Sequence, residues 1–174
     1  KRAFFTPLDW HLLRHCSVPV YLVGGSGMAL PHKVVAAVEV SDLESADDEL
    51  NDRIIKKACS LAMQCNAELH LLFACEISAV FLADMDGLTL ADLTKALRGD
   101  LEKSFLRLAG RFGVPPDRRH FIDGHPVKVL SEFAEEHNVD VIVMGRVQYH
   151  GLDKLLGSTT EHILYQAPCC VLAV

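Results

Sequence analysis

The sequence predicts an α/β fold built on a parallel sheet. Apolar stretches of strand length alternate with longer segments whose apolar residues recur at helical spacing, which is the order expected when helices cross over between parallel strands. The stretch 139–144 is apolar nearly throughout and ends at Gly145, as a strand buried on both faces does. Half of the 174 residues are hydrophobic, which is enough to build a sizeable core.

The expected strands are short apolar runs bounded by polar residues, glycine or proline. They cover 33–38, 68–74, 119–122, 139–144 and 169–174. The last strand contains Cys169 and Cys170, whose side chains must face opposite sides of the sheet. No Cys-x-x-Cys pair occurs, so neither a zinc ribbon nor a thioredoxin-like site is indicated. Most of the six cysteines lie in apolar segments, and we expect buried free thiols in a cytosolic protein.

The expected helices carry apolar residues three and four positions apart. They cover 47–65, 89–112, 126–137 and 158–167. Gly113-Val-Pro-Pro116 ends the second helix, and Pro126 stands at the start of the third, where its missing N–H costs nothing. Asn138 is a plausible C-cap for that third helix, and Ser158 is the expected N-cap of the last one.

The first 23 residues look like a second copy of the chain's own end. The segment 10–23 can be laid over 161–174 without a gap, and both segments indicate a short helix followed by an apolar strand. Thr6 and Pro7 supply an N-cap and a first-turn proline for the earlier helix. We therefore predict that 1–23 is the final helix and strand of a preceding domain, that 24–32 is a linker, and that 33–174 is a domain.

Composition and motifs exclude several function classes. The net charge of −6 argues against a nucleic-acid partner, and no apolar stretch is long enough to predict a membrane span. The basic and apolar start, Lys1–Phe5, is too short for a signal peptide, so a cytoplasmic location is expected. No catalytic constellation or metal-ligand set stands out, and we expect a protein that is not an enzyme and holds no metal.

Four motifs together resemble the universal stress protein family, and in particular the second half of its tandem, two-domain type with the end of the first half attached. The motifs are Ala36–Ser41, Gly124–Pro126, Val141–Gly145 and Gly157–Glu161. The resemblance implies a five-stranded parallel sheet with helices on both faces. It also implies that the last strands of two domains pair, across a homodimer or within an intrachain pseudo-dimer. The strand in 18–23 should then run antiparallel beside 169–174.

The resemblance further implies a nucleotide site. ATP-binding members carry glycine, two residues, glycine, nine residues, then glycine and a small polar residue. Here Gly145, Gly157 and Ser158 match, whereas Gln148 replaces the second glycine and only eight residues, 149–156, separate it from Gly157. Glu39 stands in place of the family's usual aspartate. Glutamine adopts a positive φ less readily than glycine and leaves less room for a phosphate.

The candidate ligand-binding residues lie at three chain segments that a parallel sheet brings together at the ends of its strands. They are Val38, Glu39, Val40, Ser41, Met144, Gly145, Arg146, Gly157, Ser158 and Thr159. Of these, Gly145, Gly157, Ser158 and Thr159 would hold phosphates, and Glu39 would contact a ribose. Arg146, Tyr149, His150 and Lys154 in the intervening loop could hold a further anion.

Two functions remain open at this point. In the first, the protein responds to stress by binding a small anionic ligand, either a nucleotide such as ATP or a smaller metabolite, and acts through contacts with other proteins. In the second, the glycine loop has lost its ligand and the chain is a protein-interaction module. Gln148 and the shortened loop favour the second function, whereas the glycine and serine at the start of the last helix favour the first.

Overall fold

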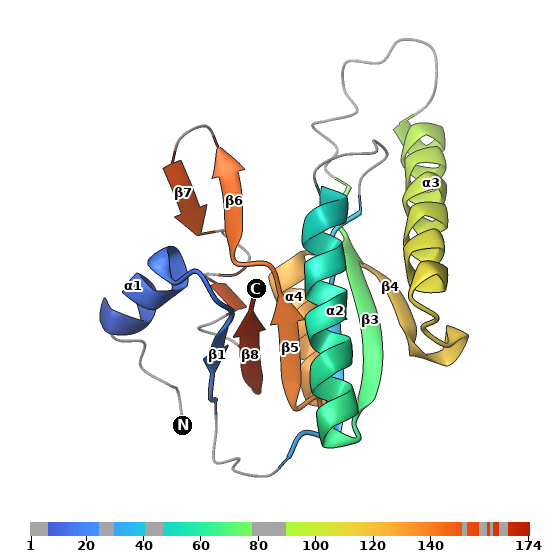
Figure 1. The fold of residues 1–174 in the computed structure, drawn as a ribbon. Helices are drawn as coiled ribbons and strands as arrows, with labels where there is room; N and C mark the ends of the chain where they lie inside the picture. Colours follow the sequence, from blue (N-terminus) through green and yellow to red (C-terminus); the bar gives the residue numbers. More distant parts are fainter. Residues whose placement is uncertain are drawn as a thin grey trace.

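The computed structural model describes residues 7–24, 30–40, 47–77, 90–150, 153–156, 160, 162–163 and 167–174. Its main sheet has six strands in the order β1-β8-β5-β2-β3-β4 (Figure 1). These strands are β1 (Val20–Leu22), β2 (Lys33–Ala37), β3 (Glu68–Cys75), β4 (Arg119–Asp123), β5 (Val141–Met144) and β8 (Cys170–Ala173). Strands β2, β3, β4, β5 and β8 are mutually parallel, which confirms the predicted α/β fold.

The sixth strand, β1, is the strand expected from the N-terminal segment. It pairs antiparallel with β8, with Val20 opposite Ala173 and Leu22 opposite Val171, so the predicted pairing is confirmed and is made within one chain. Gly24 follows β1 at a point where a Cβ atom would lie 2.7 Å from the carbonyl oxygen of Cys169. Only glycine therefore lets the chain leave the sheet this closely. The division into domains at 23 and 33 stays a prediction.

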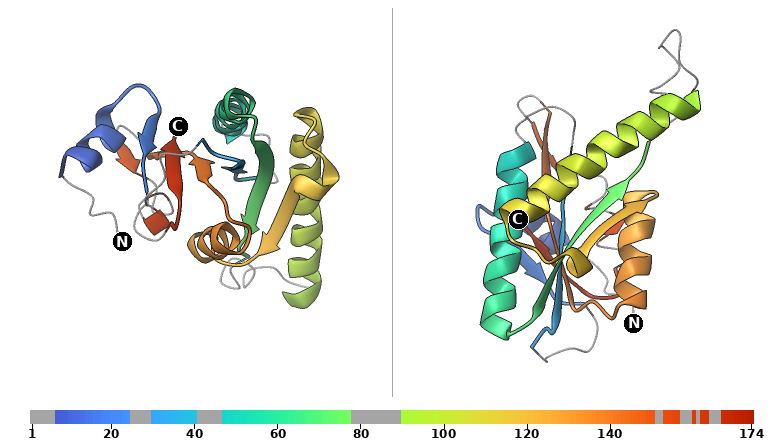
Figure 2. Two further views of the ribbon diagram at one scale, coloured as in Figure 1. Left: turned by 90° about the horizontal axis from the view of Figure 1, so that it is seen from below. Right: turned by 90° about the vertical axis from the view of Figure 1, so that its right-hand side faces the viewer.

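Helices cover both faces of the sheet. The described helices are α1 (Pro7–His15), α2 (Asp47–Cys65), α3 (Leu90–Arg111) and α4 (Pro126–Glu136), with a short 3₁₀ helix at Pro116–Arg118. Figure 2 shows α2 and α4 on opposite sides of the strands. Thr160, His162 and Ile163 are helical, as the last predicted helix requires, while the rest of 158–167 apart from Ala167 lies outside the described residues.

Side chains alternate between the two faces of the sheet along each strand, so the core has two parts, one on each face. Val34 and Ala36 of β2 point to the face covered by α2 and α3, where Ile55 and Phe105 are buried. Val35 points to the other face and packs with residues of α4, and Leu13 of α1 is fully buried in the same cluster. Because β2 is buried on both faces, its sequence is a continuous apolar run and not an alternating one.

Three helices end in the same way. Asn66 after α2, Gly113 after α3 and Asn138 after α4 have positive φ values of 52°, 65° and 51°. In each case the next residue donates its N–H to a carbonyl five residues back, for example Val139 to Ala134 at 2.9 Å. This closing bond satisfies a carbonyl that the helix end would otherwise leave unpaired. It also explains why β5 begins at Val141 and not at the predicted residue 139.

The segment predicted as an open loop after Gly145 contains a hairpin. Strands β6 (Val147–His150) and β7 (Asp153–Leu156) pair antiparallel in a small second sheet, with Gln148 opposite Leu155. Val147 and Tyr149 favour strands, and a two-residue connection that begins with Gly151 is typical of a hairpin. Those local preferences outweighed the loop that the motif spacing indicated.

Two histidines, buried His70 and half-buried His120, form a pair on the α4 side of the sheet. Nδ1 of His70 in β3 lies 2.9 Å from Nε2 of His120 in β4, and the two rings stack with centroids 5.2 Å apart. Phe133 of α4 and His137, the residue that follows this helix, cover His120. Burial, followed by the charges of His70 and His137, lowers the pKa of His120 to about 4. Burial also lowers the pKa of His70, against the opposing effect of Glu68.

These lowered pKa values predict a loss of stability in mild acid. The unfolded chain takes up protons at the usual histidine pKa near 6.5, whereas folded His120 takes one up only near 4. The free energy of unfolding should therefore fall as the pH drops from about 7 to about 5, by up to about 1.4 kcal/mol per pH unit for each proton. Urea unfolding across this range measures the slope, and His120→Gln should flatten it. Equal slopes for the two proteins would contradict the prediction.

Candidate functional site

The candidate site lies where the order of connections in the sheet reverses. From β2 the chain proceeds outward to β3 and β4, and it then returns to the other side of β2 to form β5 and β8. Strands β2 and β5 are parallel neighbours, with Ala36 opposite Val143. Their carboxyl ends therefore open at the same edge, side by side, which is the place where open α/β sheets bind ligands.

The end of β2 is fixed by the first turns of α2. The buried side chain of Asn51 accepts the N–H of Glu39 at 3.2 Å and donates to the carbonyl of Glu39 at 2.5 Å. Val38 is buried and donates its N–H to the carbonyl of Leu72 in β3. Asn51 thus holds both the N–H and the carbonyl of Glu39. Glu39 itself is an exposed residue at the edge of the sheet.

The end of β5 is held from three directions. Met144 is buried and accepts the N–H of Val174 at 2.9 Å. A Cβ atom at Gly145 would lie 2.9 Å from a methyl group of Leu50, so α2 packs directly against the bare backbone here. The buried hydroxyl of Thr160 donates to the carbonyl of Gly145 at 2.6 Å and ties the last helix to the strand end.

Arg146 extends away from this strand end toward the N-terminal segment. Its guanidinium donates to the carbonyl of Cys16, and to the carbonyl of Val18 at 3.2 Å. Cys16 follows α1 directly, so the positive charge lies at the negative end of the helix dipole. The backbone N–H of Arg146 donates to Val174. Arg146 therefore joins the candidate site to the segment that carries α1 and β1.

The structure brings together only part of the predicted set. Val38, Glu39 and Val40 lie at the end of β2, and Met144, Gly145 and Arg146 lie at the end of the adjacent β5. Ser41 and the predicted phosphate-binding residues 157–159 lie outside the described residues. Gln148 lies in β6, and with Tyr149, His150 and Lys154 it belongs to the hairpin that replaces the predicted loop.

Sequence reasoning missed three residues that shape the site: Leu50, Asn51 and Thr160. Asn51 could have been found, because it is a polar residue close to the apolar side of the helix over 47–65. Thr160 stands inside the motif Gly157–Glu161 that carried the resemblance, but nothing in the sequence distinguishes its hydroxyl from that of Thr159. Nothing in a single sequence indicates that Leu50 packs against Gly145.

Neither a metal centre nor a membrane span is visible in the parts that the structure describes. Among those residues, no group of three or more His, Cys, Asp or Glu side chains could hold a metal ion. His11 and His15 do lie one turn apart on α1, with ring centroids 4.6 Å apart, but no third ligand joins them there. None of the described helices combines the length and the apolar character that crossing a bilayer needs.

The family model of the universal stress proteins matches residues 32–174. The chain belongs to the universal stress protein family. Membership of this family places the chain among proteins of the stress response. This universal stress protein also resembles the tandem members in its structure, because β1 pairs with β8 in the way that the tandem arrangement implies.

Curated relatives and solved structures agree with this assignment. The chain is 31% identical over 173 residues to a universal stress protein E homolog of Haemophilus influenzae, and 33% identical to universal stress protein E of Photorhabdus laumondii. It covers 56% and 55% of those proteins, so it spans about half the length of the relatives it matches. This span is consistent with the second half of a tandem protein.

A shorter relative and two solved structures give further comparisons. The chain is 32% identical to universal stress protein A homolog 1 of Coxiella burnetii and covers 94% of it. A functionally unknown protein of Pseudomonas aeruginosa has the same fold with a TM-score of 0.79 and 25% identity, covering 97% of this chain and 56% of that one. A universal stress protein of Archaeoglobus fulgidus gives a TM-score of 0.64.

The contacts of Arg146 predict that this residue holds the N-terminal segment on the domain. Arg146→Ala removes two charge-assisted hydrogen bonds, which should lower the local stability of residues 11–22 by about 1.5–3 kcal/mol. Hydrogen–deuterium exchange should show faster exchange in α1 and β1 and unchanged exchange in β3. Arg118→Ala, which removes a guanidinium that contacts Glu68, is the matched control. Unchanged exchange in α1 and β1 would show that Arg146 does not hold them.

Proposed function

We propose that this universal stress protein binds a small anionic ligand, with a nucleotide such as ATP as the first candidate, at the carboxyl ends of β2 and β5. The observation that carries the proposal is the meeting of these two strand ends at the point where the connections of the sheet reverse, with a glycine at the end of β5. The bound form would then act through contacts with other proteins.

The residues at this edge suit the two ends of a nucleotide differently. Glu39 offers a carboxylate that can accept hydrogen bonds from ribose hydroxyls, and the main chain that carries it is fixed by Asn51. Gly145 has no side chain, so a ligand that displaced Leu50 could approach the backbone at the end of β5. The phosphates would lie toward residues 157–159, an assignment that rests on the sequence motif alone. A structure of a universal stress protein in complex with cAMP, 22% identical to this chain with a TM-score of 0.51, shares the fold.

A second candidate function is a protein-interaction module without a ligand, and three observations favour it. Leu50 already packs against Gly145, so it occupies space that a ligand would need. The guanidinium of Arg146 is bonded to main-chain carbonyls of the N-terminal segment. The hairpin β6–β7 replaces the open glycine loop. Under this alternative the strand ends are packed against α2 and the last helix, and the surface helices do the binding.

Isothermal titration with MgATP separates the two functions, with Gly145→Ala as the test variant. The proposal predicts micromolar binding that this variant weakens about tenfold, or about 1.4 kcal/mol, because the new methyl group pushes Leu50 toward the ligand. The matched control is Gly110→Ala in α3, where a Cβ atom meets nothing within 4 Å. Its affinity should equal that of the unchanged protein.

Two results would count against nucleotide binding. The first is the absence of heat with MgATP from protein that unfolds cooperatively and carries no nucleotide detectable by mass spectrometry. The second is equal weakening by Gly145→Ala and Gly110→Ala, since Gly145 follows β5 at the candidate site whereas Gly110 lies in α3. Either result would favour the second candidate function, a protein-interaction module without a ligand.

A further inference from the structure

Positive charge is concentrated on one part of this acidic chain. Residues 53–65 and 103–112, the C-terminal parts of α2 and α3 with one residue beyond, contain six of the 17 Lys and Arg residues and none of the 23 Asp and Glu residues. The other residues of the chain therefore carry 11 basic side chains against 23 acidic ones. A protein with a net charge of −6 thus has a basic face, which we define by Arg53, Lys56, Lys57, Lys103, Arg107 and Arg111.

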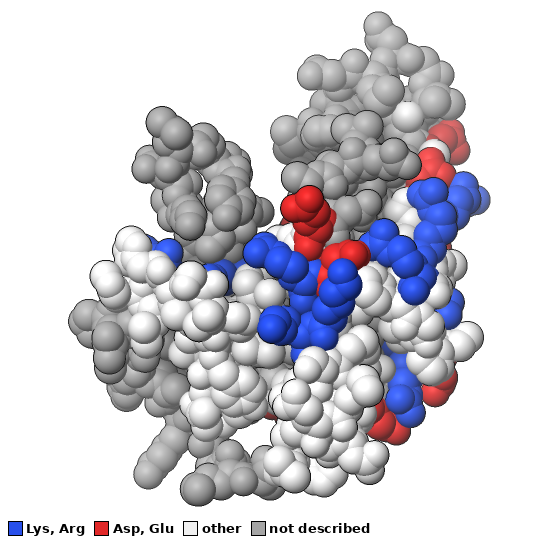
Figure 3. All heavy atoms as spheres, viewed as in Figure 1, with Lys and Arg blue, Asp and Glu red and all other residues white. Residues whose placement is uncertain are grey.

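The two helices present these cations on one continuous surface. All six residues of the basic face are exposed. Asp52 lies between the helices, where it pairs with Lys56 at 3.3 Å and also with Arg111 from α3. This shared carboxylate links the two helices and neutralises only part of the charge. Figure 3 shows the blue side chains gathered over α2 and α3 on the face turned to the viewer.

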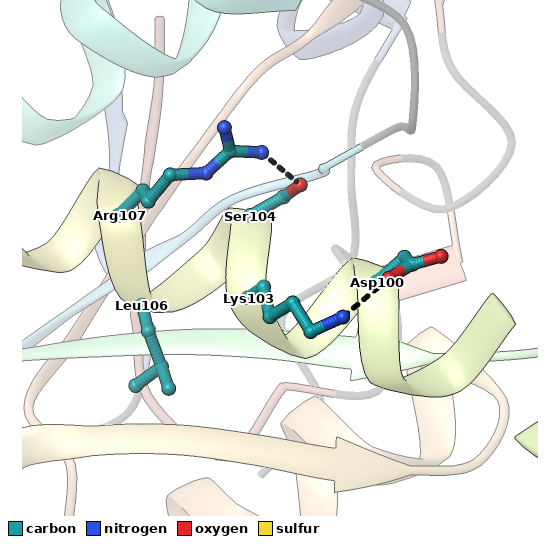
Figure 4. A pocket seen from close by; sticks show the side chains of 5 residues that line it. All are labelled: Asp100, Lys103, Ser104, Leu106 and Arg107. Carbon is teal, nitrogen blue, oxygen red and sulfur yellow. Dashed lines mark hydrogen bonds and ion pairs between the residues drawn. The ribbon is translucent and has the colours of Figure 1, made fainter. Parts of the chain in front are cut away.

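Exposed apolar side chains accompany the cations. Met63 in α2 is 83% exposed and lies two helical turns after Lys56, on the same side of the helix. Leu106 in α3 is 44% exposed, and with Lys103 and Arg107 it lines an open hollow along that helix (Figure 4). Arg and Met are among the residue types enriched in protein-binding surfaces.

The side chains in this hollow are arranged on a rigid element. Lys103 donates to Asp100 at 2.8 Å and Arg107 donates to Ser104 at 2.9 Å, all within α3 (Figure 4). Both interactions are exposed contacts between neighbours on a helix, which contribute little energy and can be exchanged for contacts with a partner. The helix beneath them is held by Phe105 and Leu108, which are buried against the sheet.

We propose that the basic face of α2 and α3 binds an acidic amphipathic segment of another protein, in which Asp or Glu residues alternate with apolar residues at helical spacing. The carboxylates would meet the six cations, and the apolar residues would cover Met63 and Leu106. Nucleic acid fits this surface less well, because phosphates would leave both apolar side chains in water and would face Asp52 and Asp100.

This face is separate from the candidate ligand site. Its cations belong to the outward sides of α2 and α3, whereas the site lies at the carboxyl ends of β2 and β5. The proposal therefore stands whether or not the chain binds a nucleotide. It also identifies a surface through which a universal stress protein of this kind could contact another protein.

The test uses a synthetic helical peptide with Glu on one face and Leu on the other, labelled with a fluorophore. Fluorescence anisotropy with the full chain at an ionic strength of about 0.15 M should give saturable binding, which weakens as salt is added. Lys57→Glu should weaken the binding at least fivefold. Lys128→Glu, the same reversal at an exposed lysine of α4 across the sheet, is the control and should change the affinity less than twofold.

Two further measurements complete the design. Leu106→Ser should weaken the binding of the peptide, because the peptide places apolar groups on Leu106. It should leave any binding of a labelled single-stranded oligonucleotide unchanged, because an oligonucleotide makes no such apolar contact. Urea unfolding confirms that each variant folds. The proposal is overturned if the peptide does not bind at about 0.15 M salt, if Lys57→Glu and Lys128→Glu act equally, or if the oligonucleotide binds more tightly than the peptide.

Discussion

The parallel hydrogen bonding of β2 to β5 in the middle of the sheet decides where the other elements lie. Because β3 and β4 extend the sheet from one side of β2, the returning chain must place β5 and β8 on the other side. That reversal leaves two strand ends facing the same edge, while α2 and α4 cover opposite faces. The buried run of β2, packed on both faces, makes the arrangement stable, and β8 offers the edge on which β1 pairs.

The same edge of the sheet combines the proposed ligand site with a connection to the N-terminal segment. Gly145 brings the backbone close to α2, and Arg146, the next residue, reaches the carbonyls after α1. A ligand that displaced Leu50 or moved the end of β5 would act on residues that also hold α1 and β1. This gives a physical route from occupancy of the site to the pairing of β1 with β8, while the basic face on α2 and α3 remains free to bind a partner.

Much of the fold could be predicted because its signals are local. The apolar runs gave the strands to within two residues, and the helix over 47–65 was placed at its observed bounds. The antiparallel pairing of β1 came from the repeat of the chain's own end. The hairpin 147–156 was missed because motif spacing was given more weight than the strand preference of Val147 and Tyr149. The packing of Leu50 on Gly145 and the reach of Arg146 join residues distant in sequence, and one sequence carries no record of such contacts.

The most direct test of the central claim is to map MgATP onto the protein by following backbone amide resonances in two-dimensional NMR during a titration. A ligand site at the ends of β2 and β5 should give saturable shifts centred on residues 38–40 and 144–146, with smaller shifts along α1 and β1 through Arg146. Resonances of the basic face should stay in place. Shifts confined to α2 and α3, or no shifts at all from folded protein, would contradict a ligand site at the ends of β2 and β5.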